Sequence, residues 1–463
     1  PASLAQQQSV SETDGKTVES TAPQRQPPAL RLDRAIDRAL ANYPSVKVAL
    51  AKEGAAREGI ALSRTAYLPR FDFLLQENRA SRNNFFGLLL PQSIVPSVAG
   101  PVLGTRAPDS VWDSAGGLLA SWEPFDFGLR RANVSIAEAQ DRQADAEEKV
   151  TRLGVAVTAA DAFLAYLATK RTVIAADANV QRMRTFAKTV HVLVDNQLRA
   201  GADASRADAE VAAAEIQLIQ AQQASEVARA NLAEAIGSPG SAVDIDPGPL
   251  LKDIPDPLIP AEALQSHPLA LVQQAAVDTV LARERVLERS YVPKFYLQTS
   301  LSERGSGALL NGGIDNSKGF LPDVPNWAVG ITVTFPAFDI FSIRSRKRIE
   351  ANNEAAERAV YEQTLQKLQA NNDRSRVITE AARRIAAQSP VAVQGALEAE
   401  TRARARYDAK LATVNEVADA ERLLAQAEVD DVVARLGVWR ALLAAASASG
   451  DIRPFLNEFL RRQ

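Results

Sequence analysis

Alternation of apolar and polar residues predicts four short strands. It is clearest in "VGITVTF" (329–335), where Val329, Ile331 and Val333 alternate with glycine or threonine. The same period of two, with some interruptions, is found in residues 71–76, 114–122 and 295–301. These segments pair into two predicted β-hairpins, which span residues 68–124 and 292–336.

A longer period follows each hairpin and predicts long helices. Residues 125–238 contain no proline, and apolar residues recur at spacings of three and four from Val173 to Val194. The polar segment "DNQLRAGAD" (195–203) divides this region. At 1.5 Å per residue the first helix would be ~100 Å long, so it would need neighbours along its whole length. The predicted antiparallel helix pairs are 130–197 with 203–236, and 343–409 with 413–447, the third helix being perturbed at Pro390.

The order of helix, β-hairpin and helical hairpin occurs twice, which indicates an internal duplication. "AYLPRF" (66–71) and "SYVPKF" (290–295) precede the two hairpins, "FDF" and "FDI" follow them, and "RADAE" (206–210) matches "VADAE" (417–421). Prolines mark the strand starts and ends: Pro69, Pro124, Pro293 and Pro336. The predicted divisions are a disordered or loosely attached N-terminal segment (1–30), a first repeat (31–240) with its helical hairpin at 127–236, a proline-rich linker (241–260), a second repeat (261–448) with its helical hairpin at 341–447, and a C-terminal tail (449–463).

Composition excludes several classes of function. The chain has no cysteine and a net charge of −3, so disulfides, thiolate chemistry and a general basic field for nucleic acid are excluded. No phosphate loop, nucleophile elbow or His-rich metal motif occurs, and His191 and His267 are interpreted as structural, so we expect neither an enzyme nor a metal or other cofactor. The chain contains no run of about 18 apolar residues without charge, so the sequence argues against a transmembrane helix. "PASLA" before "QQQ" is either the remnant of a signal-peptide cleavage site or an ordinary tail.

The predicted strands are too few to form a closed structure within one chain. Four strands leave a sheet with two bare edges, which is a liability for a soluble protein. One face is apolar and the other is small or polar, as the wall of a membrane barrel requires. We therefore expect several copies to combine their strands into one barrel and their long helices into a second tube. A soluble coiled-coil scaffold is the alternative, but it leaves the alternation at 329–335 unexplained.

The duplicated order of these motifs resembles the TolC-like outer-membrane factor family over residues 30–448. The resemblance implies a mostly α-helical fold with a small β part: a homotrimer with a 12-stranded β-barrel, four strands per protomer, and a trimeric α-barrel of long antiparallel helices. It places the barrel in the outer membrane of a Gram-negative bacterium and the helices in the periplasm. It also implies passive export, in which an inner-membrane pump of RND or ABC type and a periplasmic adaptor pass cargo to this duct for efflux or type I secretion.

The resemblance further implies a gate at the periplasmic end. The acidic pair of the family falls on "EVADA" (416–420), so Glu416 and Asp419 would form two acidic rings in a trimer. A solvated helix face is the alternative interpretation. The arginine with which the family often latches this end is replaced by Ala412, and Lys410 is the nearest basic substitute.

Four residues at the predicted helix turns would meet an adaptor at the tip: Arg199, Gly201, Lys410 and Leu411. A plain surface turn is equally consistent with their composition. Basic residues follow the two hairpins: Arg130, Arg131, Arg344, Arg346 and Lys347. We expect these to contact outer-membrane lipid headgroups, with a solvated face as the alternative and no role in nucleic-acid binding. Trp112, Trp122 and Trp327 are interfacial or core residues, and Asp126 and Asp339 are turn or cap residues.

Overall fold

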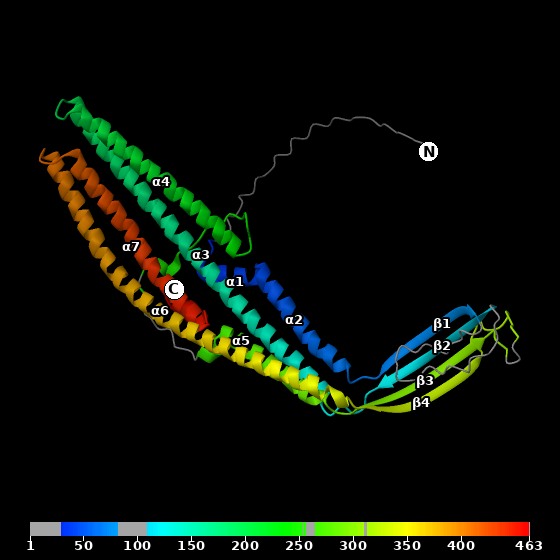
Figure 1. Ribbon diagram of the computed structural model, residues 1–463. Coiled ribbons are helices and arrows are strands. Elements are labelled where there is room, and N and C mark those ends of the chain that lie inside the picture. Colours follow the sequence, from blue (N-terminus) through cyan, green and yellow to red (C-terminus); the bar gives the residue numbers. More distant parts are fainter. Residues whose placement is uncertain (1–28, 82–108, 253, 256–263, 310–312, 463) are drawn as a thin grey trace, which may run out of the picture.

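The computed structural model describes residues 29–81, 109–252, 254–255, 264–309 and 313–462. These residues form an elongated molecule with a sheet at one end and two helical tips at the other (Figure 1). Most of the predicted N-terminal segment and the long loop of the first β-hairpin lie outside the described residues. The prediction of a mostly α-helical chain with a small β part is confirmed.

Both predicted β-hairpins are present, and they join into one antiparallel sheet. The strands are β1 (Arg70–Ser81), β2 (Ser110–Trp122), β3 (Lys294–Ser306) and β4 (Val324–Thr334). Their order in the sheet is β1-β2-β3-β4, so β1 and β4 are its free edges. Each proline predicted at a strand start or end lies within two residues of a strand.

The helices follow a similar order in each half. The first half has α1 (Leu32–Asn42), α2 (Pro44–Thr65), α3 (Leu129–Asp195) and α4 (Gly201–Ala235). The second half has α5 (Pro268–Ser290), α6 (Ile340–Asp408) and α7 (Val414–Ser449). In each half a helix of more than 65 residues packs against a shorter helix near the sheet and a returning helix near the tip (Figure 1).

These helices form one curved layer. Near the tips α4 packs on α3, α3 on α7, and α7 on α6. Nearer the sheet the order is α2, α3, α5 and α6. The layer therefore has two free edges, with α6 along one edge and α2 or α4 along the other.

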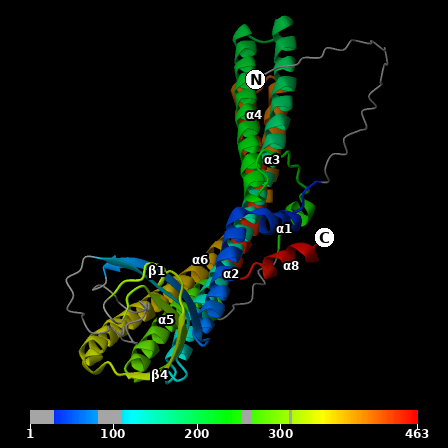
Figure 2. The same cartoon turned by 90° about the vertical axis from the view of Figure 1, so that its right-hand side faces the viewer.

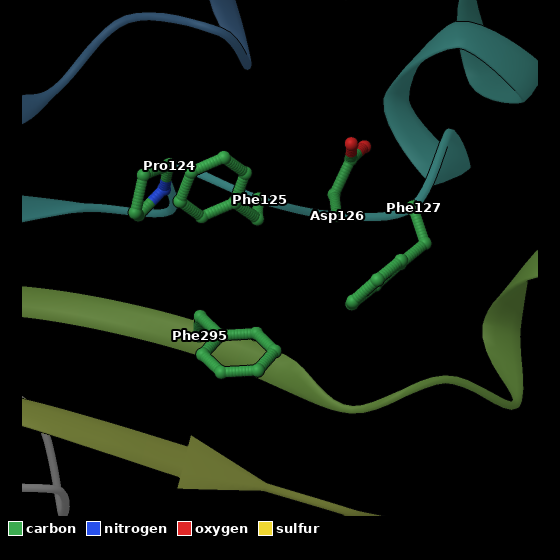
Figure 3. Close-up of a pocket in the computed structure, with 5 residues that line it drawn as sticks. All are labelled: Pro124, Phe125, Asp126, Phe127 and Phe295. Atoms are coloured by element: carbon green, nitrogen blue, oxygen red, sulfur yellow. The ribbon is translucent and has the colours of Figure 1, made fainter.

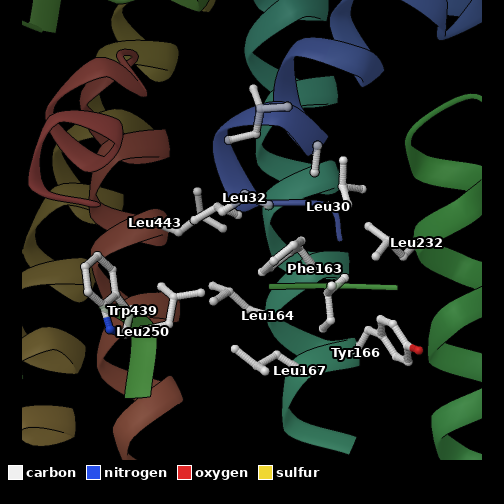
Figure 4. Close-up of a cluster of buried hydrophobic side chains, with 14 of the residues drawn as sticks. Leu30, Leu32, Phe163, Leu164, Tyr166, Leu167, Leu232, Leu250, Trp439 and Leu443 are labelled. Atoms are coloured by element: carbon white, nitrogen blue, oxygen red, sulfur yellow. The ribbon is translucent and has the colours of Figure 1, made fainter. Parts of the chain in front are cut away.

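The largest core lies at the middle of the helical part, where residues from both halves meet (Figure 4). Phe163 and Leu164 of α3 and Trp439 of α7 are buried here with Leu32 of α1. Stretches of α3 and α7 are long and apolar enough to cross a membrane by composition alone, so the argument from the sequence against any such helix was too strict. Here the apolar side chains of both helices supply this internal core.

The C-terminal tail predicted at 449–463 contains a further helix, α8 (Arg453–Arg461), which lies near α1 (Figure 2). Phe455 and Phe459 are buried, and both rings meet the Trp439 ring edge-on, with centroids 6.0 and 6.4 Å away. The spacing of four residues places both rings on one helix face. This segment is therefore part of the core rather than a loose tail.

The helix α6 continues through Pro390, where the sequence predicted a perturbation. Proline has no backbone N–H to donate to Ala386, four residues earlier. The Ser389 hydroxyl lies 3.3 Å from that carbonyl and 2.6 Å from Asp431 Oδ1 on α7. The shorter contact takes the single hydroxyl proton, so Ser389 connects α6 to α7 at the turn that contains Pro390.

The two helical tips have the same backbone structure. The helices α3 and α6 end in a left-handed residue, Gln197 (φ 57°) and Lys410 (φ 64°). The amides of the following leucines, Leu198 and Leu411, each donate to a carbonyl five residues back at 2.8 Å, a helix C-cap of the Schellman type. Gln197 and Lys410 are structurally equivalent and lie 213 residues apart. The sequence match of "RADAE" with "VADAE" has an offset of 211, so it pairs residues that differ by two positions from the structural equivalents.

Candidate functional site

One face of the sheet carries a continuous apolar surface. Across the four strands, Phe73 pairs with Leu118, Leu118 with Leu301, and Leu301 with Trp327. All four side chains are exposed, Trp327 by 76%. Apart from Leu74, the neighbouring row on the opposite face is small or polar: Gly117, Ser302 and Asn326. The predicted division into an apolar and a polar face is confirmed by this register.

The sheet's tryptophans lie on the apolar face. Trp112 meets Phe320 edge-on at 5.5 Å and lies under the Arg79 guanidinium at 5.2 Å. The indole N–H of Trp122 donates to the Tyr67 carbonyl at 3.2 Å. Trp327 is open to the surroundings. This placement favours the interfacial interpretation over the core interpretation.

Aromatic side chains gather where the chain leaves the sheet for the helices. Phe125, Phe127 and Phe295, with Pro124 and Asp126, line a cavity of about 320 Å³ (Figure 3). The rings of Phe127 and Phe295 are 6.0 Å apart. Phe338 and Phe341, at the equivalent place in the second repeat, are 87% and 69% exposed. Exposed aromatic rings below an apolar sheet face are typical of a membrane-water boundary.

The structure divides the predicted basic residues into two groups. Arg130 is 7% exposed. Its guanidinium lies 3.1 Å from Asp126 Oδ2, donates to the Ala66 carbonyl at 3.2 Å and covers the Tyr67 ring at 4.8 Å. Arg130 therefore joins the start of α3 to the end of α2 and is not free for lipid headgroups.

The remaining basic residues, Arg131, Arg344, Arg346 and Lys347, are exposed or partly exposed, although Lys347 also pairs with Glu288 of α5 at 3.0 Å. The prediction that Asp126 is a cap residue is confirmed, because its carboxylate accepts from the backbone N–H groups of Gly128 and Arg130. Asp339 lies in a short 3-10 turn, and its side chain makes no cap hydrogen bond to α6.

At the far end, Arg199 connects the two helical tips. From the turn between α3 and α4 it donates to the carbonyls of Tyr407 (3.2 Å) and Ala412 (3.1 Å), which belong to the other tip. Its guanidinium also stacks over the Tyr407 ring at 4.5 Å. By the offset of 213, Arg199 is the duplicate of Ala412. The arginine missing at Ala412 is therefore present at the equivalent position of the first repeat.

A small apolar cluster lies behind this contact. Phe186 of α3 meets the buried Tyr407 ring at 5.2 Å, and Ala207, Ala412 and Val417 complete the contact between the hairpins. Gly201 is the first residue of α4, whereas Lys410 and Leu411 are exposed beyond the cluster. The predicted tip residues thus differ in environment: Arg199 faces inward, and Lys410 and Leu411 face outward.

The predicted acidic pair lies on the exposed surface of α7. Glu416 accepts from the backbone N–H of Thr413 at 3.1 Å, and the Glu416 N–H faces the Thr413 hydroxyl at 3.4 Å, which forms a capping box. Arg406 lies 3.7 Å from Glu416, and Arg422 lies 2.6 Å from Asp419. Each carboxylate therefore has a basic neighbour, which reduces the negative potential that the pair would present.

Further charged contacts join the hairpins, and the sequence did not predict them. Arg182 of α3 pairs with Glu421 at 2.9 Å and with Glu428 at 3.0 Å, both on α7. Nearer the central core, Arg440 of α7 forms a bidentate salt bridge with Asp161 of α3, at 2.7 and 2.9 Å. The partners are about 240 to 280 residues apart, so no local pattern indicates them.

The histidines have structural partners. His191 pairs with Asp208 at 2.8 Å across the first tip, and His267 accepts from the Leu269 N–H at 3.1 Å as the N-cap of α5. Within the described part of the chain, no group of three or more acidic, histidine or cysteine side chains is arranged to hold a metal ion.

Comparisons with known proteins agree with this geometry. Residues 35–238 match the family model of the outer membrane efflux protein. The fold is similar to that of VceC from Vibrio cholerae, with 17% identity, a TM-score of 0.72 and coverage of 91% of this chain and 96% of that chain. It is also similar to CmeC from Campylobacter jejuni (15% identity, TM-score 0.73, coverage 93% and 89%) and to MtrE from Neisseria gonorrhoeae (20%, 0.71, 91% and 89%). No curated protein shows significant similarity in sequence.

This chain shares with these outer-membrane proteins a fold in which a four-stranded sheet joins two long helical hairpins. The match to the outer membrane efflux protein family covers the first repeat, and the described chain as a whole has the fold of the channel subunits compared above.

Proposed function

We propose that three copies of this chain form the exit duct of a tripartite export system. The observation that carries this proposal is that both layers of the protomer are open at both sides. The sheet ends in β1 and β4, and the helical layer ends in α6 on one side and in α2 and α4 on the other. Head-to-tail association in a ring joins β1 to β4 and α2 or α4 to α6 of the next copy, so that no edge remains.

The free edge of the helical layer carries apolar side chains in rows. On α6, Ile349, Ile378 and Ile385 are all more than half exposed. On α4, at the opposite edge, Ile216, Ile219 and Val227 are equally exposed. Apolar rows at both edges of one layer fit an interface between copies.

Twelve strands set the width of the barrel. A strand spacing of ~4.8 Å and a tilt near 40° give a diameter of ~25 Å, wide enough for water. The apolar sheet face would contact lipid, and the polar face with Ser302 and Asn326 would line the lumen. Arg131, Arg344 and Arg346, which follow the strands, would contact phospholipid headgroups at the inner surface of the outer membrane.

The helical tips are the docking site for a periplasmic adaptor, which joins the duct to an inner-membrane pump of RND or ABC type. Leu198 and Leu411 occupy equivalent positions of the two tips and are 50% and 70% exposed. Six such leucines would surround the mouth of a trimer. Export through the duct is passive, and the chain performs no chemistry on its cargo.

The mouth is closed by contacts between the hairpins, with Arg199 as the latch of each protomer. Glu416 and Asp419 form the gate surface, but their pairing with Arg406 and Arg422 makes the cation preference weaker than two unpaired acidic rings would give. Opening requires the α6–α7 hairpin to move away from α3 and α4, which breaks the two hydrogen bonds from Arg199.

Extraction, size and conductance test the proposal together. The full chain should need detergent for extraction, should have the mass of three copies in multi-angle light scattering, and should form ion-conducting pores in planar lipid bilayers. A monodisperse monomer in aqueous buffer without conductance in lipid would contradict the duct.

A further inference from the structure

A buried carboxyl pair lies between α6 and α7, on the side of this hairpin that packs against α3. Glu421 of α7 is 0% exposed. Arg182 of α3 lies 2.9 Å from its Oε2, and the Glu400 carboxyl of α6 is close enough to help raise the pKa of Glu421. Glu400 itself is 7% exposed. Two acidic groups therefore meet at a place that water scarcely reaches.

The charges around Glu421 come from three helices. Arg182 is the basic group from α3, Arg404 lies 3.4 Å from Glu400 on α6, and Glu428 on α7 takes the other side of the Arg182 guanidinium at 3.0 Å. Two arginines thus face three carboxyl groups. If every carboxyl group were ionised, the cluster would hold one uncompensated negative charge.

The cluster also lacks a hydrogen-bond donor. Glu421 Oε1 is buried and has no hydrogen-bond donor. A buried acceptor without a donor is costly, and two adjacent ionised carboxylates are costlier still. One proton on the pair supplies the missing donor and removes the surplus charge.

We propose that Glu400 and Glu421 share one proton and that this proton-binding site holds the α6–α7 hairpin against α3 in the closed duct. Glu421 lies seven residues after Val414, the first residue of α7, so the site is ~10 Å from the tip. Loss of the proton leaves two carboxylates in contact and favours their exposure to water. Movement of the α6–α7 hairpin away from α3, which opens the mouth, exposes the pair to water.

The direction of the pH effect follows from linkage. Burial, and secondly the Glu400 charge, raise the pKa of the Glu421 carboxyl above its ordinary value, while Arg182 opposes them. The packed arrangement therefore binds the proton more tightly than an opened one. Its stabilisation is complete below the ordinary glutamate pKa and is lost as the pH rises through the raised pKa. Alkaline conditions should favour opening.

The proton can be observed without any channel measurement. Infrared spectra of the purified, detergent-solubilised full chain near neutral pH should contain the C=O stretching band of a protonated carboxylic acid that disappears in Glu421→Gln and in Glu400→Gln. The matched control is Glu428→Gln, which also removes a partner of Arg182 but leaves the carboxyl pair in place, so the band should remain. The same band in all four proteins would overturn the proposal.

Single-channel recording tests the coupling to opening, which rests on the proposed duct. Wild type and Glu428→Gln should open about tenfold more often at alkaline than at acidic pH, equivalent to about one unit of pKa difference. Glu421→Gln and Glu400→Gln should lose this pH dependence of opening, because an amide donates a hydrogen bond at every pH. If one of these variants fails to fold, the other one tests the coupling. A retained pH dependence in both variants overturns the coupling. If wild type conducts at no pH, the duct fails, and the infrared band alone decides the proton site.

Discussion

The two ends of the molecule are held together by different forces. At the sheet end, a continuous antiparallel ladder joins all four strands, and the side chains on one face are apolar and exposed. At the tips, the two hairpins meet through one small apolar cluster and a series of charged contacts, of which Arg199 and Arg182 are the main donors. A ladder that lipid surrounds has no water to replace its hydrogen bonds, whereas the charged contacts at the tips can exchange with water. In the proposed duct, the sheet end is therefore expected to stay assembled while the tips open.

The largest expected effect lies at the sheet end. Val329→Arg places a charge at the middle of β4 on the apolar face and should cost about 2–4 kcal/mol per protomer, because the charge must enter lipid. We expect loss of the inserted trimer, measured as heat-stable oligomer in outer-membrane fractions. Ala328→Arg, one residue earlier on the polar face, is the matched control and should assemble. Equal loss in both variants would contradict the assignment of the two faces.

At the tip end, Arg199→Ala should open the duct. The substitution removes two hydrogen bonds from a charged donor and the stack on Tyr407, together about 2 kcal/mol after allowance for partial exposure. We expect a roughly 30-fold higher open probability in planar bilayers, with no change in trimer stability. Arg206→Ala, an exposed arginine on α4, should behave as wild type. An open probability for Arg199→Ala equal to that of this control would show that Arg199 is not the latch.

A smaller effect distinguishes the two tips from each other. The helix α7 begins with the capping box of Thr413 and Glu416, whereas α4 begins after Ala200 without a side-chain cap. Thr413→Ala should destabilise the first turn of α7 by about 1 kcal/mol, and Ala200→Thr should stabilise that of α4 by a similar amount. Hydrogen exchange of the first-turn amides measures both. Opposite changes are expected, and changes in the same direction would contradict the capping assignment.

The smallest effect concerns the exposed contact of His191 with Asp208. The Asp208 carboxylate, through its hydrogen bond, raises the pKa of His191 above the ordinary value of 6.5. The contact is therefore complete below that value and is lost as the pH rises through the raised pKa. NMR titration of the His191 ring should show the raised pKa, and Asp208→Asn should lower it. An unchanged titration in the variant would contradict the pairing.

Much of the fold could be predicted because it depends on local periodicity. The period of two at 329–335, the absence of proline from 125–238 and the duplicated landmarks gave the strands, the long helices and their order. The structure differs where tertiary contacts decide. Arg130 looked like a surface basic residue, but Asp126 and Tyr67 enclose it. The spacing of Phe455 and Phe459 was a usable signal for α8 that the interpretation as a tail overlooked.

The candidate site was less predictable than the fold. Glu416 and Asp419 came from resemblance to a family, and their basic neighbours Arg406 and Arg422 became evident only in three dimensions. Arg199 could have been found, because the repeat offset of the hairpin exits places it at the duplicate of Ala412. The contact of Arg182 with Glu421 joins helices 239 residues apart in sequence and has no counterpart in any local pattern.

The free edges of both layers have a genetic consequence in the proposed ring. Each copy uses β1 and β4, and likewise α4 and α6, to hold two different neighbours, so a copy with one damaged edge can still join from the other side. Such a copy blocks closure for the intact subunits that it recruits. Alleles that damage a single edge should therefore be dominant over wild type in a cell that carries both, whereas alleles that abolish folding should be recessive.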